Sequence, residues 1–272
     1  RLVAKKPTAV ADFHGVLRST YLRMRFNMER FRVEHINKHR SGKRALTSSS
    51  DKRMVQQPTS FDNYAEVLAR LGYPVKLQFS SIFGNEGGDL SLLPAAIGKR
   101  NEGEQWIGIA PFAAHKGKVY PPEMMERVID LIEENNPHCR IFLFGRGRDE
   151  SHTFPEWCAR HSHCIFVGEH LDTMRQELVL MSHLDVMVSM DSANMHMASL
   201  TGTPVVSVWG ATHPYAGFMG WNQSEDNAVQ LDLPCRPCSI FGNKPCRRGD
   251  FACMNGIKPE QIYDKINRLL SH

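Results

Sequence analysis

The sequence has 272 residues, of which 42% are hydrophobic and 23% charged, with a formal net charge of +4. This composition predicts a globular protein with a sizeable core, and the length allows one large or two modest domains. No apolar run approaches the roughly 20 residues of a membrane span, and the opening residues lack the apolar region of a secretory signal. Seven cysteines, an odd number, argue against a secreted disulfide scaffold, so a cytoplasmic protein is expected.

The first hundred residues are predicted to form a small α/β region. The pattern indicates a strand over 8–13, a helix from about 16 to 28, an amphipathic helix over 62–71 and a further strand over 75–79. Residues 40–53 are basic and Ser-rich without hydrophobic periodicity, which predicts a surface loop.

The basic residues between positions 23 and 53 allow two interpretations. They either form a solvated face or contact an anionic acceptor, such as a phosphorylated glycolipid at a membrane surface. They give little support for nucleic-acid binding.

A Gly-, Asn-, Glu- and Ser-rich stretch, residues 83–103, is the predicted linker between two domains, 1–100 and 101–272. Beyond it, apolar strands alternate with helices, which predicts right-handed crossovers and a parallel sheet. The predicted strands cover 106–110, 140–144, 164–167, 184–190 and 205–209. The predicted helices cover 121–135, 154–161, 172–182, about 194–200 and 259–270, the last a candidate to pack back on the N-terminal domain.

Ligands of parallel α/β sheets bind outside the carboxyl ends of the strands. The segments that follow the predicted strands each contain Gly, a charge or a hydroxyl. They are 111–118, 145–149, 168–170, 191–196 and 210–213. The sequence therefore predicts a binding cleft at this edge, with Gly145 and Gly168 allowing close approach of the backbone.

The turn after strand 184–190 is the best candidate for an anion site. Asp191 reads as the N-cap of the next helix, whose free amides and positive dipole end would attract phosphate. The amides of Ser192 and Ala193 are candidates to bind a diphosphate, and His196 shares a helix face with Ser192. The alternative is an ordinary capped helix with a buried histidine.

The loop after strand 106–110 is the second candidate. Ala113 and Ala114 would let the backbone approach a ligand, and Lys116 and Lys118 would neutralise phosphate charge. The alternative is a surface loop with two lysines.

Cys235, Cys238, Cys246 and Cys253 lie in one loop and match the ligand count of a structural zinc site. The spacing between the pairs is shorter than in common zinc ribbons. It favours reduced or partly paired cysteines over zinc.

Four segments together resemble glycosyltransferase family 9, the ADP-heptose:lipopolysaccharide heptosyltransferases. The stretch 189–212, SMDSANMHMASLTGTPVVSVWGAT, resembles the C-terminal signature of the family. Asp12, His14, Gly15, Arg18 and Ser19 match its D-x-[HQ]-G-x-x-[RK]-S segment, and residues 118–121 match K-x-[WY]-P. The Cys loop, 235–254, is similar to a Cys-rich segment of many members.

This resemblance implies a GT-B fold, with two Rossmann-like domains of parallel sheets. The C-terminal domain would bind an ADP-sugar and the N-terminal one the acceptor, with Asp12, His14 and Arg18 on the acceptor side. Ala113 and Ala114 stand where members often have hydroxyl residues, which leaves only backbone donors there. The family's G-D-[VI] turn, whose Asp is the expected general base, does not occur after Arg1. The N-terminal domain is therefore expected to be truncated and the catalytic base to lie before this sequence.

The resemblance implies an inverting, metal-independent transfer of a heptose-like sugar from ADP-heptose to a lipopolysaccharide core acceptor at the inner membrane surface. No cofactor is expected beyond the ADP-sugar substrate. Two alternatives remain: a nucleotide-binding fragment without activity, or a GT-B epimerase acting on a nucleotide sugar alone.

Overall fold

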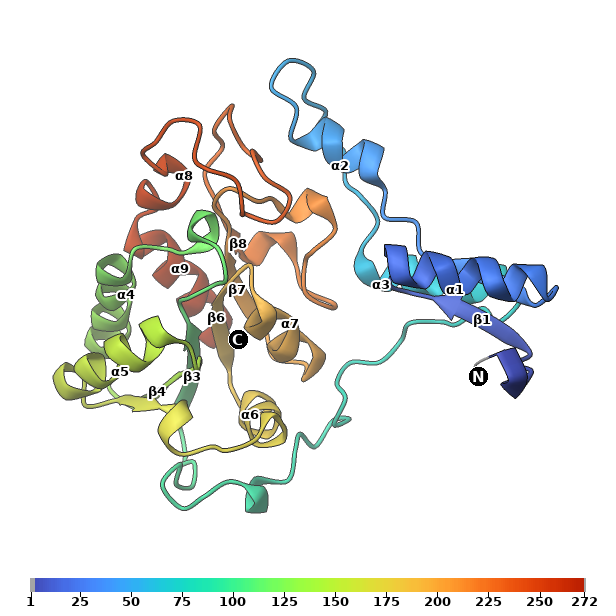
Figure 1. Cartoon of the computed structure of the whole chain (residues 1–272). Coiled ribbons are helices and arrows are strands. Elements are labelled where there is room, and N and C mark those ends of the chain that lie inside the picture. Colours follow the sequence, from blue (N-terminus) through green and yellow to red (C-terminus); the bar gives the residue numbers. More distant parts are fainter. Residues whose placement is uncertain (1–2, 272) are drawn as a thin grey trace. The chain divides into compact units, whose positions relative to one another are not determined.

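The structure, a computed structural model, describes residues 3–271, which divide into two compact units (Figure 1). The N-terminal unit comprises the chain up to Leu46 together with Arg53–Gln78 and Tyr215–Phe218. The C-terminal unit comprises Thr47–Lys52, Phe79–Pro214 and the chain from Met219 onward. The division therefore falls near residue 79 instead of residue 100, because the predicted linker packs on the C-terminal unit.

The N-terminal unit is built on a two-stranded parallel sheet. Strands β1 (Ala9–Asp12) and β2 (Arg32–His35) pair in parallel and are joined by helix α1 (Leu17–Met28). Helix α3 (Ser60–Arg70) also contacts both strands, and its N-cap is Thr59, whose side chain accepts a hydrogen bond from the amide of Asp62. The strand over 8–13 and both long helices are confirmed, whereas β2 was not predicted.

Two predictions for this part of the chain are wrong. Residues 40–46, expected to be a loop, form helix α2 (Arg40–Leu46), which Leu46 anchors with a fully buried side chain. Residues 75–79, all of them described, form no strand, and Val75, Leu77 and Phe79 are exposed. An alternating apolar pattern makes a strand only where a neighbouring strand accepts its hydrogen bonds.

The C-terminal unit is a six-stranded parallel sheet with helices on both faces. Its strands are β3 (Gln105–Ala110), β4 (Cys139–Leu143), β5 (Cys164–Phe166), β6 (Val186–Met190), β7 (Val205–Val208) and β8 (Ala228–Val229). Its helices are α4 (Pro122–Asn135), α5 (Arg148–Arg160), α6 (Met174–Met181), α7 (Ala193–Leu200), α8 (Ala252–Asn255) and α9 (Pro259–Leu270). Helices α4, α5 and α9 lie on one side of the sheet, and α6 and α7 on the other (Figure 1). The five predicted strands are confirmed, and the two-residue β8 is additional.

The strand order, β5-β4-β3-β6-β7-β8, fixes the place of the site. The chain builds the sheet outward from β3 to β5, returns to the other side of β3, and then builds outward again from β6 to β8. This is the doubly wound order, and ligands bind where the direction reverses, outside the carboxyl ends of the two central strands. In this chain those strands are β3 and β6.

Burial explains why the central strands are apolar along their whole length. Ile107, Ile109, Val186 and Val188 are fully buried, because helices cover both faces of the sheet. Helix α9 packs on α4 and contacts β6 and β7 within this unit. None of the helices in the described residues combines the length and apolar character that crossing a bilayer requires.

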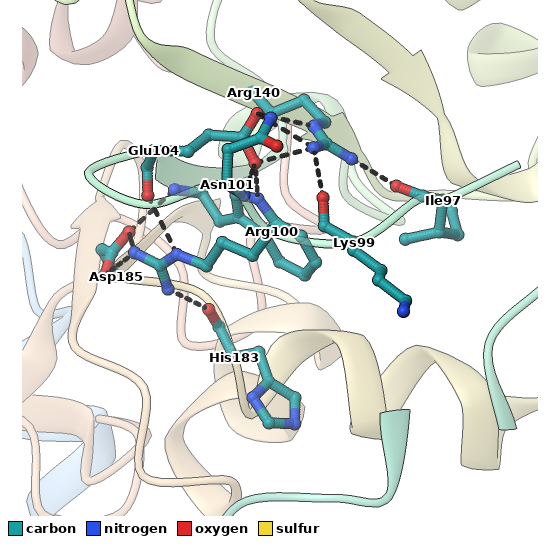
Figure 2. Close-up of polar contacts among 9 residues, drawn as sticks. Ile97, Lys99, Arg100, Asn101, Glu104, Arg140, His183 and Asp185 are labelled. Atoms are coloured by element: carbon teal, nitrogen blue, oxygen red, sulfur yellow. Dashed lines mark hydrogen bonds and ion pairs between the residues drawn. The ribbon is translucent and has the colours of Figure 1, made fainter. Parts of the chain in front are cut away.

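A polar network at the amino edge of the sheet holds the segment before β3 in place (Figure 2). Glu104 pairs with Arg140 at 2.6 Å and accepts the indole N–H of Trp106 at 2.7 Å. Arg100 pairs with Asp185, which also accepts the amide of Trp106. Burial raises the pKa of Glu104, but the hydrogen bonds from Arg140 and Trp106 outweigh it and hold that pKa below its ordinary value.

Replacing Glu104 should therefore destabilise the chain. Glu104→Gln leaves the Arg140 guanidinium, which is 16% exposed, without its carboxylate, and the free energy of unfolding should fall by about 2–4 kcal/mol. The pKa of Glu104 is lower in the folded state than in the unfolded chain. The ionised Glu104 therefore contributes its full stabilisation above the ordinary Glu pKa, and this stabilisation is lost as the pH falls through the folded-state pKa.

Urea unfolding at pH 7 measures this loss, with Glu134→Gln as the control. Glu134 is paired with Arg127 on the surface, where both side chains are half exposed, so the control should change stability by less than about 0.5 kcal/mol. Equal losses in the two variants would contradict the assignment.

Candidate functional site

An ion pair joins the two loops that meet where the sheet reverses direction. Lys118 ends a short 3-10 helix, Lys116–Lys118, after β3, and Asp191 directly follows β6. The Lys118 Nζ lies 2.9 Å from the Asp191 Oδ2, and the two side chains are 15% and 5% exposed. The pair thus places a fixed, partly desolvated ammonium at the position where doubly wound sheets bind ligands.

His196 is the third member of this cluster. It lies on α7, one turn beyond Asp191 and Ser192. Burial lowers the pKa of His196, Lys118 lowers it further, and Asp191 acts in the opposite direction. The imidazole is therefore neutral at pH 7 and has one donor and one acceptor nitrogen for a ligand.

The amino end of α7 differs from the prediction in one respect. The N-cap is Ser192, not Asp191, because the Asp191 carboxylate turns to Lys118. The Ser192 side chain makes no capping hydrogen bond to the first amides, and its hydroxyl lies 3.2 Å from that of Ser189. The first-turn amides and the positive end of the helix dipole therefore remain available to an anion.

The loop after β7 and the Cys loop pack around the base of Lys118. The amide of Ala211 donates to the carbonyl of Gly117 at 2.8 Å, and the amide of Cys238 donates to the carbonyl of Ala211 at 3.1 Å. Gly242 has φ +75°, and a Cβ there would lie 2.6 Å from the Lys118 Cγ. Both its conformation and its contact with Lys118 require glycine at this position.

The predicted glycines of the cleft lie at the ends of the neighbouring strands. Gly145 follows β4, Gly168 follows β5, and the carbonyl of Gly145 lies 3.3 Å from where a Gly168 Cβ would stand. The carboxylate of Glu150 lies beside Gly145 and Gly147 at the start of α5. Glu150 was not predicted, because only the turn between β4 and α5 brings it back over the glycines.

The other site residues predicted after β3 lie at the same carboxyl edge of the sheet but are more exposed to solvent. Ala113 is half-buried, and Ala114 and Lys116 are exposed. The Lys116 ammonium stands 5.3 Å from the centroid of the Phe251 ring. Of the two lysines, only Lys118 is held in the central cluster.

Arg236 is a second residue that sequence reasoning missed. It is 5% exposed and donates to the carbonyls of Gly210 and Thr212 and to the side chain of Gln230. Burial lowers the pKa of Arg236, and burial together with Arg236 lowers that of His213 to about 4. Arg236 thus fixes the loop after β7, a role that its position between Cys235 and Pro237 does not reveal.

The residues predicted for the acceptor side belong to the N-terminal unit. Asp12 accepts the amides of His14 and Gly15, each at 2.9 Å, and pairs with Arg23 at 3.1 Å. Burial raises the pKa of Asp12, but these hydrogen bonds and the Arg23 charge outweigh it and lower that pKa. Asp12 therefore holds the turn before α1, whereas His14 and Arg18 are exposed.

The four cysteines of the C-terminal loop line one small cavity, and cationic side chains surround it. Arg236, Lys244, Arg247 and Arg248 share its wall. Burial raises the pKa of Cys238 and Cys253, while at Cys246 backbone N–H groups outweigh burial and lower it. All seven cysteines are free, and within residues 3–271 no three His, Cys, Asp or Glu side chains are arranged to hold a metal ion.

The parallel α/β architecture, with its doubly wound strand order, is that of the GT-B fold. The model of glycosyltransferase family 9 (heptosyltransferase) matches residues 2–245, and the chain belongs to this family.

Solved structures share this fold at low sequence identity. The E. coli heptosyltransferase WaaC with ADP aligns with a TM-score of 0.61 at 15% identity, covering 97% of this chain and 73% of that one. A glycosyltransferase of family 9 from Veillonella parvula aligns with a TM-score of 0.64 at 16% identity, covering 100% and 76%.

A curated relative is lipooligosaccharide heptosyltransferase 2 of Campylobacter jejuni, which is 29% identical over 85 residues. The match covers 31% of this chain and spans about a quarter, 26%, of that relative.

The cluster predicts opposite shifts of the His196 pKa in two variants. Lys118→Met removes a nearby positive charge and should raise the His196 pKa, whereas Asp191→Asn removes a negative charge and should lower it. An NMR titration of the imidazole protons measures both. His152, whose side chain is 80% exposed, provides a reference signal in the same spectra. Shifts of the same sign would show that the three groups do not interact as described.

For the Cys loop, we expect well under one equivalent of zinc in the purified chain and thiols that react with a thiol reagent. Elemental analysis measures the first and a thiol titration the second. One zinc per chain, lost in Cys238→Ser, would overturn this expectation and establish a four-thiolate site.

Proposed function

We propose that this protein is a glycosyltransferase that moves a heptose-like sugar from ADP-heptose to the lipopolysaccharide core. Transfer inverts the anomeric carbon and requires no metal. The single observation that carries the proposal is the Lys118–Asp191–His196 cluster at the amino end of α7, where the central strands end.

The donor diphosphate would bind to this cluster. The Lys118 ammonium has three N–H donors and is held beside Asp191 by an ion pair, so it can donate to phosphate oxygens. Asp191 is then a positioning residue: its carboxylate repels phosphate but holds Lys118 in the cleft. The amides of Ser192 and Ala193 and the His196 imidazole would complete the diphosphate site.

These fixed donors also have a chemical role. Negative charge develops on the ADP leaving group as the bond from the sugar to the diphosphate breaks, and preorganised donors stabilise that charge without rearrangement. Gly145 and Gly168, together with Ala113, Ala114 and Lys116, would form the wall along which the rest of the nucleotide sugar lies.

The names of the relatives support the choice of donor and acceptor. The E. coli structure with the same fold contains ADP, and the Campylobacter jejuni relative is named for a lipooligosaccharide acceptor. On the acceptor side, His14 and Arg18 are exposed in a strongly basic region that suits an anionic glycolipid. We place the protein in the cytoplasm, peripheral at the inner face of the inner membrane.

Asp12 is not proposed as the general base that deprotonates the acceptor hydroxyl. A general base works best with a pKa near the operating pH, and the pKa of Asp12 is lowered. Its oxygens are also committed to Arg23 and to the turn at Gly15. We therefore assign no catalytic base among the described residues.

Lys118→Ala should weaken ADP binding by about 1–3 kcal/mol, or roughly 5- to 150-fold, because a charge-assisted contact with phosphate is lost. Isothermal titration calorimetry with ADP measures the change. Lys99→Ala is the matched control, since Lys99 is an exposed lysine of the same unit near the amino edge of the sheet (Figure 2). Unchanged ADP affinity in Lys118→Ala would contradict the donor site.

A transfer assay separates the reaction from its alternatives. With ADP-heptose and a deacylated lipopolysaccharide core acceptor, we expect heptose on the acceptor and free ADP, with the rate unaffected by EDTA. Conversion of the donor without acceptor would indicate epimerisation, and ADP binding without either product would indicate a binding module.

A further inference from the structure

A pocket lies at the amino edge of the large sheet, the edge opposite the Lys118–Asp191–His196 cluster. Its volume is about 500 Å³, within the roughly 300–1,000 Å³ that small-molecule sites occupy. One wall is formed by residues 80–87 and another by residues 222–227, and the ends of α6 and α7 with the residues that lead into β6 and β7 lie between them. We call it the amino-edge pocket.

Hydrogen bonds hold the walls of the amino-edge pocket in place. The amide of Ile82 donates to the carbonyl of Leu200 at 2.9 Å. The amide of Gly88 donates to the Ser182 hydroxyl at 2.8 Å. On the other wall, the Gln223 side chain accepts the first amide of β7 at 2.7 Å. The Gly-, Asn- and Ser-rich stretch that the sequence suggested as a linker therefore builds part of a fixed pocket.

The lining of the pocket is polar and neutral. None of the described residues that line it carries a charge, and most have a hydroxyl or a carboxamide side chain. A charged ligand would find no counter-charge here, and an apolar ligand would cover these polar groups without replacing their water. Hydroxyl and carboxamide groups both donate and accept hydrogen bonds, so the lining favours a neutral ligand with several hydroxyls.

Some amide groups of the lining are available to such a ligand. Asn227 is 9% exposed, and its side-chain oxygen accepts a hydrogen bond from Arg268 at 2.8 Å. Its amide nitrogen has no partner among residues 3–271. The side chains of Asn85 and Asn222 are exposed and make no hydrogen bond within the same part of the chain. The pocket thus has unused donors and acceptors on both walls.

A pair of aromatic side chains stands beside the pocket. The rings of Phe79 and Trp221 stack with their centroids 4.7 Å apart and an interplanar angle of 8°. The next residues in the chain, Ser80 and Asn222, line the pocket, one on each wall. Phe79 is 38% exposed, so its ring presents apolar surface beside the polar lining.

We propose that the amino-edge pocket binds a neutral saccharide. A pyranose ring combines hydroxyl groups at its edge with an apolar C–H face, and the pocket offers a partner for each. The hydroxyls would bond to the Asn222 and Asn227 amides, and the C–H face would pack on Phe79. This site is separate from the diphosphate cluster, and the proposal does not depend on the proposed transfer reaction.

Titrations of the full chain with maltose, lactose and N-acetylglucosamine, followed by saturation-transfer NMR, test the proposal. We expect at least one of them to bind with a Kd on the order of millimolar, because few groups contact the sugar. The Kd should not change with salt, since no ion pair forms, or in the presence of saturating ADP. Glucuronate should bind more weakly, because its carboxylate would lose water without gaining a counter-charge.

Two variants localise the binding. Asn222 has φ +53°, so Asn222→Gly removes the carboxamide and keeps the backbone conformation. Phe79→Ala removes the aromatic surface. Each should raise the Kd of the bound saccharide about fivefold. Asn135→Ala is the matched control, since Asn135 is an exposed asparagine at the end of α4, and it should bind like the wild type.

The melting temperature and the ADP affinity of the same variants show whether the effect is local. Both should stay close to the wild-type values, because the substituted side chains are exposed and lie away from the donor cluster. Loss of saccharide binding with intact ADP binding would support the proposal, whatever the outcome of the transfer assay. No saccharide signal up to about 20 mM, an equal Kd in wild type and both variants, or competition with ADP would overturn it.

Discussion

The ion pair between Lys118 and Asp191 is the interaction on which the organisation of the C-terminal unit depends. Both groups are largely withdrawn from water, and either charge alone would be costly there. They come from the loops after β3 and β6, which meet only because the strand order reverses between these strands. The sheet therefore brings the two charges together, and the pair fixes an ammonium near the amino end of α7.

The two edges of the same sheet use charge in different ways. At the amino edge, Glu104 and Arg140 satisfy each other and their neighbours, which fastens the segment before β3. At the carboxyl edge, Lys118 pairs with the Asp191 carboxylate, and the N-cap Ser192 makes no side-chain hydrogen bond to the first turn of α7. The charged groups of the amino edge thus pair with one another, whereas the ammonium and the helix amides at the carboxyl edge can still donate to an anion.

Local patterns in the sequence were sufficient for most of this fold but not for the contacts that complete it. Apolar runs and helix boundaries predicted five strands of the large sheet and the loops at their carboxyl ends, because each of these signals is contained in a few consecutive residues. The partner of Asp191 could not be predicted, since a capping role explains the same residue locally and Lys118 reaches it only through the strand order. Short elements such as β8 and α2 were also not predicted, because they form through tertiary contacts such as the burial of Leu46.

The central claim is that a nucleotide diphosphate binds where β3 and β6 end. A crystal structure of the chain with ADP bound tests this claim most directly. The account predicts phosphate oxygens within hydrogen-bond distance of the Lys118 ammonium and of the amides of Ser192 and Ala193. ADP bound elsewhere, for example in the uncharged pocket that Ser182, Thr203 and Gln223 line at the amino edge, would contradict it.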